Sequence, residues 1–128
     1  MSGRPLGDEI RELLAAKTDR KLLFASTVCA CAQALLEDRA VPTARARQLC
    51  LEAITRRRHL PVLVGFAVGM IPMATLETAW EDADLCSDVA DLMIRQGAMA
   101  EFWRQVRKRD LGVWTAIAPL VDAVGGRT

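Results

Sequence analysis

The sequence predicts an all-α fold, a compact single-domain bundle of six to seven helices over residues 1–128. Two observations predict it. Apolar residues recur at helical spacing along most of the chain, and no useful stretch alternates with the two-residue period of a strand. Ala and Leu are abundant, so helix formers outweigh β-branched residues. A chain of 128 residues can bury a core without disulfides or metal ions. We expect only residues 1–5 and 125–128 to be flexible.

The first half of the chain predicts three helices. Residues 6–18 place acids in the first turn and apolar residues at helical spacing. Residues 19–39 are apolar on nearly every side, which predicts a central, buried helix. A third helix begins at Pro42 and Thr43 and leads to the arginines at 56–58.

The second half predicts shorter helices separated by proline and glycine. Pro72 breaks the helical pattern because proline lacks the N–H and clashes with the preceding turn. Gly97 is expected to end a helix as its C-cap, and Pro119 to end or kink the last one. The expected helices are 61–70, 72–82, 85–97, 98–110 and 111–124.

The stretch Leu60–Leu76 contains no charged residue and raises the alternative of a membrane segment, which needs about 17–25 apolar residues. Pro61 and Pro72 leave about ten uninterrupted residues, and these span only about 15 Å. We therefore expect the buried centre of the bundle, with an exposed oligomer interface as a further alternative. Gly65 and Gly69 lie four residues apart, and we expect the closest helix approach at both.

Cysteine and histidine give little support to catalysis or metal binding. Cys29, Cys31, Cys50 and Cys86 lack the spacing of zinc or thioredoxin sites, so we expect reduced thiols that pack as small apolar residues. The polar start of the sequence has no signal-peptide pattern, which favours a cytoplasmic protein. His59 is expected to be a cap or surface residue. We expect no catalytic residue, metal or cofactor.

The charges are unevenly distributed along the chain. Residues 1–58 contain eleven Lys/Arg and seven Asp/Glu, a balance of +4, whereas residues 59–128 contain six and nine, a balance of −3. Chance variation on a solvated surface is the simpler explanation. The alternative is a contact surface, and its candidate residues are the acids Glu77, Glu81, Asp84 and Asp88 and two basic groups, Arg56, Arg57 and Arg58, and Arg104, Arg107 and Lys108 with Arg109.

The stretch "ADLMIRQGAMAEFWRQVRKRD" consists of an amphipathic helix, the corner Arg95-Gln96-Gly97, and a second amphipathic helix. It resembles the final helix pair of bacterial effector-associated and death-like adaptor domains, in which a short corner joins two helices. The resemblance covers residues 90–110 and implies homotypic, non-enzymatic contacts. The rest of the chain departs from that family, because the 19–39 helix is longer and a further helix follows residue 110.

These observations favour a non-enzymatic protein–protein interaction module that acts through homotypic or charge-complementary helix contacts. Its expected partner is a second copy of the chain or another protein. The first alternative is a nucleic-acid-binding regulator that uses the arginine groups, although a basic excess on the domain is missing. The second is a small-ligand-binding helical protein with a pocket lined by Trp80, Trp103 and Trp114. Membrane association through residues 60–76 is the third.

Overall fold

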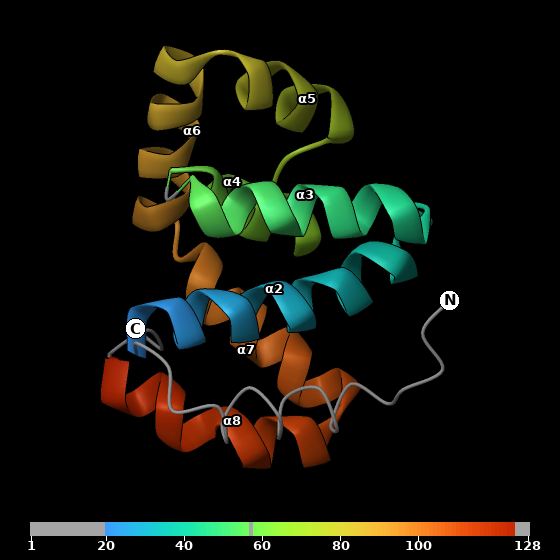
Figure 1. Ribbon diagram of the computed structural model, residues 1–128, viewed down its shortest axis with the longest axis vertical. Coiled ribbons are helices and arrows are strands. Elements are labelled where there is room, and N and C mark those ends of the chain that lie inside the picture. The colour runs from blue at the N-terminus through green and yellow to red at the C-terminus, as the bar shows by residue number, and fades with distance from the viewer. Residues whose placement is uncertain (1–19, 57, 125–128) are drawn as a thin grey trace.

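The computed structural model describes residues 20–56 and 58–124, and these form seven helices and no strand (Figure 1). The all-α prediction is confirmed. The predicted helix 6–18, the two expected flexible ends and Arg57 lie outside the described residues. The helices are α2 (Arg20–Asp38), α3 (Thr43–Thr55), α4 (His59–Ala67), α5 (Met73–Glu81), α6 (Ala83–Arg95), α7 (Ala98–Arg109) and α8 (Leu111–Val124).

Helix α4 is the centre of the molecule and contacts α2, α3, α5, α6 and α7. Residues Val62 to Ala67 of this helix are all buried, so the uncharged stretch forms a core helix rather than a long apolar span. No helix in the described ranges 20–56 and 58–124 has the length and apolar character needed to cross a membrane. Pro72 precedes α5 in an extended conformation and separates it from α4, as the sequence predicts.

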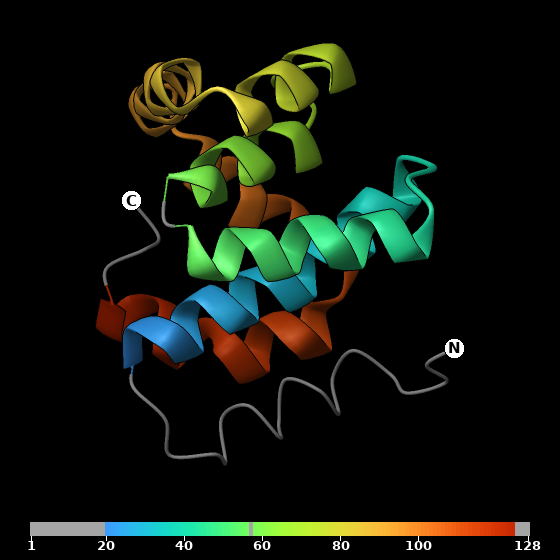
Figure 2. The same ribbon diagram turned by 45° about the horizontal axis from the view of Figure 1, so that its top comes forward.

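The five helices that contact α4 lie around it, whereas α8 packs against α2 and α7 (Figure 1). Figure 2 shows α2 and α3 side by side as a hairpin, with α5 and α6 on one side of it and α8 on the other. Helix α2 meets the expectation of a buried central helix only in part: Val28, Ala32 and Leu36 are fully buried, whereas Leu22 is 46% exposed and α4 is the central helix. Helix α8 covers the expected residues 111–124 and continues through Pro119, so this proline does not end it.

Gly65 and Gly69 have different roles. Gly65 is buried where α4 meets α6, and a Cβ atom built on it would lie 2.2 Å from Met93 Sδ. Gly69 is exposed and has a φ of +85°, and its N–H donates to the Phe66 carbonyl oxygen at 3.0 Å. The Met70 N–H donates to the Gly65 carbonyl oxygen at 2.8 Å, which completes a glycine C-cap. Gly69 therefore ends α4, and a Cβ built on it would lie 2.5 Å from Nη2 of Arg39, so its close neighbour is an arginine side chain rather than a second helix.

Candidate functional site

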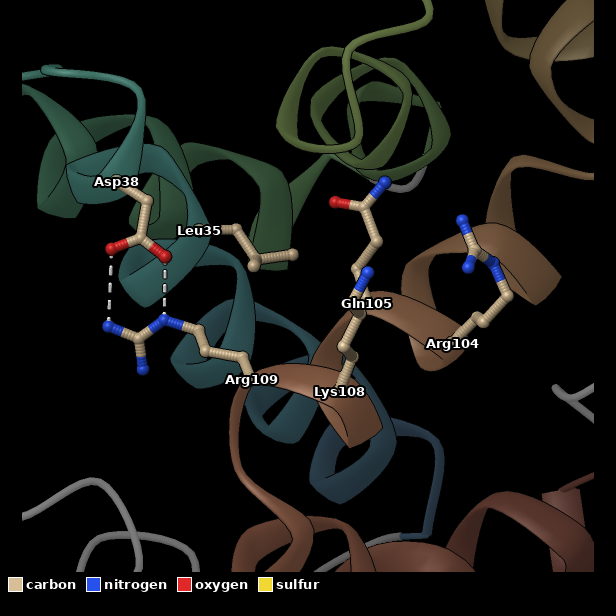
Figure 3. A pocket seen from close by; sticks show the side chains of 6 residues that line it. All are labelled: Leu35, Asp38, Arg104, Gln105, Lys108 and Arg109. Carbon is tan, nitrogen blue, oxygen red and sulfur yellow. Dashed lines mark hydrogen bonds and ion pairs between the residues drawn. The ribbon is translucent and has the colours of Figure 1, made fainter.

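A groove runs along the exposed face of α7. Helical periodicity places residues 97, 100, 101, 104 and 108 on one side of this helix, opposite the buried Phe102, Trp103 and Val106. Two open depressions, of about 480 Å³ and about 330 Å³, lie along α7 and share Arg104 as a lining residue, and we call the two together the α7 groove. The larger depression is lined by Val68, Met70, Gln96, Gly97, Ala100, Glu101 and Arg104. The smaller is lined by Leu35, Asp38, Arg104, Gln105, Lys108 and Arg109 (Figure 3).

The two ends of the groove differ in chemistry. The end near Gly97 contains Val68, Met70 and Ala100, and Met70 is 37% exposed. We call it the apolar end. The other end contains Arg104, Lys108 and Arg109 against the single carboxylate of Asp38, and we call it the cationic end. Figure 3 shows Arg104, Gln105 and Lys108 projecting from the same side of α7.

The chain at the end of α4 forms one wall of the α7 groove, and side chains of Arg39, next to α2, and Gln105, on α7, donate hydrogen bonds to it. Arg39 Nε donates to the Ala67 carbonyl oxygen at 2.8 Å, where a cation complements the C-terminal end of the α4 dipole. Gln105 Nε2 donates to the Val68 carbonyl oxygen at 3.3 Å and to Glu101 Oε2 at 2.8 Å. The positions of Val68 and Met70 beside α7 are therefore set by hydrogen bonds as well as by packing.

Two of the cations already have intrachain partners. Arg109 donates to both oxygens of Asp38, at 2.7 and 3.3 Å, and this pairing lowers the pKa of the Asp38 carboxyl group (Figure 3). Arg104 Nε donates to Glu101 Oε1 at 2.8 Å, and the Arg104 and Gln105 hydrogen bonds lower the pKa of Glu101 to about 2. Lys108 forms no ion pair with any residue that the structure describes. Of the three cations at the cationic end, Lys108 is therefore the one without a carboxylate partner among the described residues.

The four acids predicted as a candidate contact surface are all exposed, but a helix boundary divides them. Glu77 and Glu81 lie on α5, whereas Asp84 and Asp88 lie on α6. Asp82 is the N-cap between the two helices, and its Oδ1 accepts from the N–H groups of residues 84 and 85 at 3.0 Å each. The acids therefore surround a corner between two helices, and we call this surface the acidic corner. Within the described ranges, no group of His, Cys, Asp and Glu residues is suited to hold a metal ion.

The two predicted basic groups do not form one surface. Arg58 forms an ion pair with Asp91 and donates to the Ser87 carbonyl oxygen at 3.0 Å. Arg56 follows the last residue of α3. This helix begins near the end of α2 that borders the α7 groove, and its 13 residues carry the chain about 20 Å along the helix axis before Arg56. Arg107 is exposed on α7 but does not line the groove. Among the predicted cations that the structure describes, Arg104, Lys108 and Arg109 line one depression together.

Sequence reasoning did not find the contacts of His59. Its Nε2 lies 3.1 Å from the Trp80 carbonyl oxygen, so this nitrogen donates, and Nδ1 accepts from the Cys86 thiol at 3.5 Å. Trp80 Nε1 donates to Glu52 Oε1 at 2.7 Å. Burial raises the pKa of Cys86, which is only 1% exposed, so the neutral thiol is favoured over a nucleophilic thiolate. These contacts join the α4 start to the acidic corner and provide no open reactive site.

The remaining predicted residues are core residues. All four cysteines are free and buried, as expected for thiols that pack as small apolar groups. Trp80, Trp103 and Trp114 are 3%, 2% and 8% exposed and line neither depression, so the expected tryptophan-lined pocket is not among the described cavities. Comparison with known proteins gives no match to a protein-family model, to a curated protein or to a solved structure.

Proposed function

We propose that this protein is a protein–protein interaction module in which the acidic corner of one molecule binds a cationic surface of a partner. The observation that carries the proposal is the separation of charge in the fold. Between Arg58 and Arg95 the chain contains no Lys or Arg, and all its acids there lie on α5 and α6 or at their junction. Helix α7, in contrast, has four cations and a single acid, Glu101.

The simplest partner is a second copy of the chain, because each copy carries both surfaces. Single exposed ion pairs contribute only about 0.2–1 kcal/mol, so several carboxylates must act together for measurable binding. Such a contact weakens as salt rises, since the Debye length shortens from about 30 Å at 0.01 M to about 3 Å at 1 M. The homotypic contacts implied by the resemblance to death-like adaptor domains belong to the same proposal.

Nucleic-acid binding has weaker support. Three of the candidate arginines have intrachain carboxylate partners, namely Arg58, Arg104 and Arg109. The other described cations come from several elements: Arg45 and Arg47 lie on α3, and Arg107 and Lys108 on α7. A duplex-binding surface requires a continuous run of uncompensated cations against the phosphates.

The experiment compares self-association of the wild type and of the double variant Glu81→Gln with Asp88→Asn, measured by sedimentation velocity at low and high salt. We expect the wild type to associate at low salt, and the variant to associate about fivefold or more weakly because two carboxylates are neutralised. The matched control is Thr115→Lys with Ala123→Lys, which makes the same change in net charge at exposed positions of α8.

An unchanged control together with a weakened acidic-corner variant supports the proposal. Equal weakening of both variants would mean that net charge, and not the acidic corner, controls association. A wild type that remains monomeric at every salt concentration contradicts self-association. The same two variants, compared by titration against any protein that co-purifies, then test a different partner.

A further inference from the structure

Helix α6 exposes a strip that matches the α7 groove in spacing. Asp84, Asp88 and Leu92 follow one another at four-residue steps, so they lie along one side of α6. All three are exposed, and Leu92 is 39% exposed, although it is a large apolar residue. No ion pair joins either aspartate to another residue in the described part of the chain. We call these residues the α6 strip.

The α7 groove presents the complementary series at the same steps. Ala100, Arg104 and Lys108 are also separated by four residues, and the apolar end contains Met70 beside Ala100. Eight residues of helix cover about 12 Å in both series. The order is reversed, because acids come first along α6 and cations come last along α7. Two such helices are therefore complementary only when they run antiparallel.

We infer that the α7 groove binds the α6 strip of a second copy of this chain, with the two helices antiparallel. In this register Asp84 faces Lys108, Asp88 faces Arg104, and Leu92 enters the apolar end beside Met70 and Ala100. Lys108 gains a carboxylate partner, and Arg104 is shared between its own Glu101 and the incoming Asp88. Antiparallel helices also place opposite dipole ends together. This inference rests on the proposed function and identifies its partner and contact residues.

The α6 strip and the α7 groove are different surfaces of the same molecule. Each copy can therefore bind one neighbour through its strip and another through its groove. A contact between two different patches is heterologous and extends to rings or chains unless the geometry closes it as a dimer. Burial of Leu92 adds an apolar contribution that salt does not screen. The complex is therefore expected to lose affinity at high salt without disappearing completely.

The test is a charge exchange between the two helices, measured as the dissociation constant of self-association at low salt. Asp84→Lys and Lys108→Asp are each expected to weaken association about five- to tenfold, because each places like charges together. The two changes in one chain restore the opposite pair and should return the constant to within about threefold of wild type. The matched control, Asp84→Lys with Arg47→Asp, has the same net charge and alters an exposed residue of α3 instead.

The outcomes separate this inference from the proposed function. Restoration by the 84/108 exchange but not by the control supports the register. If the wild type associates but the exchange is no better than the control, the register is wrong and the broader proposal stands. If the wild type does not associate at all, the inference and the self-association proposal both fail. Circular dichroism melting of each variant shows whether a loss reflects unfolding.

Leu92 provides a second, independent measurement. Leu92→Ser is expected to weaken association about threefold or more at high salt, where the apolar contact accounts for most of the remaining affinity. Ile94→Ser is the matched control, because Ile94 is 60% exposed on the same helix but lies two residues away, on a different side. Equal effects of the two substitutions would place the contact outside the α6 strip.

Discussion

Gly65→Ala is expected to destabilise the fold, because the added methyl group has no space between α4 and α6. The new Cβ would lie 2.2 Å from Met93 Sδ and 2.7 Å from its Cγ. Met93 is only 3% exposed, so its side chain can move only by displacing other core atoms. Overpacking of this kind costs about 1–3 kcal/mol, and the better helix propensity of Ala offsets about 0.5–1 kcal/mol.

The expected net loss is therefore about 1–2 kcal/mol in the free energy of unfolding, or about 3–8 °C in Tm. Urea unfolding followed by circular dichroism measures the loss. Met93→Ala removes the atoms that the methyl group would meet, so the two substitutions should be non-additive by about 1 kcal/mol or more. Gly112→Ala is the control, because this exposed glycine on α8 has only Asp110 Oδ1 nearby, at 3.3 Å from the added Cβ.

We expect Gly112→Ala to be no less stable than wild type and up to about 1 kcal/mol more stable, because the helix propensity of Ala applies there without a core clash. The reasoning about close approach at Gly65 is refuted if Gly65→Ala is as stable as wild type. It is also refuted if the losses of Gly65→Ala and Met93→Ala simply add, since that result would mean that the methyl group and Met93 do not compete for the same space.

Two further predictions concern the helix ends. Ala40→Gly should raise the free energy of unfolding by about 1 kcal/mol, because Ala40 has a φ of +64°, a left-handed conformation that favours glycine. Urea unfolding measures the change, and an unchanged or lower stability would show that Ala40 is not strained. Glu101→Gln should reduce the acid sensitivity of folding: the pKa of Glu101 falls from 4.5 to about 2 on folding, so its contribution is complete above pH 4.5 and is lost as the pH falls toward 2. The pair is partly exposed, so the difference between pH 5 and pH 2 should be at most about 1 kcal/mol, and an identical acid profile in both proteins would refute it.

Local patterns explain how much of the fold could be predicted from the sequence. Apolar spacing and the prolines correctly predicted seven described helices, with the boundary near Pro72 and the corner at Gly97. For Pro119 the sequence left open whether the helix ends or bends, and the structure continues as one helix through it. A single sequence does not reveal whether a proline ends a helix or lies within one, because the contacts of the neighbouring residues decide.

The candidate site was predicted only in part. The sequence identified the acids of α5 and α6 and the cations of α7 as unusual clusters. It did not show that Arg58 pairs with Asp91, because packing alone brings these two distant residues together. The pair of Arg104 with Glu101, in contrast, lies three residues apart on α7, and helical spacing could have indicated it. It also allowed a ligand pocket lined by Trp103, whereas this side chain is 2% exposed and belongs to the core.

The sequence by itself determined the helical class, the buried nature of the stretch around α4 and the separation of acids from bases, because these depend on residue type and spacing along one helix. Only the tertiary structure decided that Gly65 lies at a helix contact while Gly69 ends a helix, and that the two depressions of the α7 groove share Arg104. The physical reason is that both features depend on which helices meet and at what distance. The four-residue spacing of Gly65 and Gly69 is visible in the sequence. Packing decides that the first lies at a helix contact and the second at a helix end.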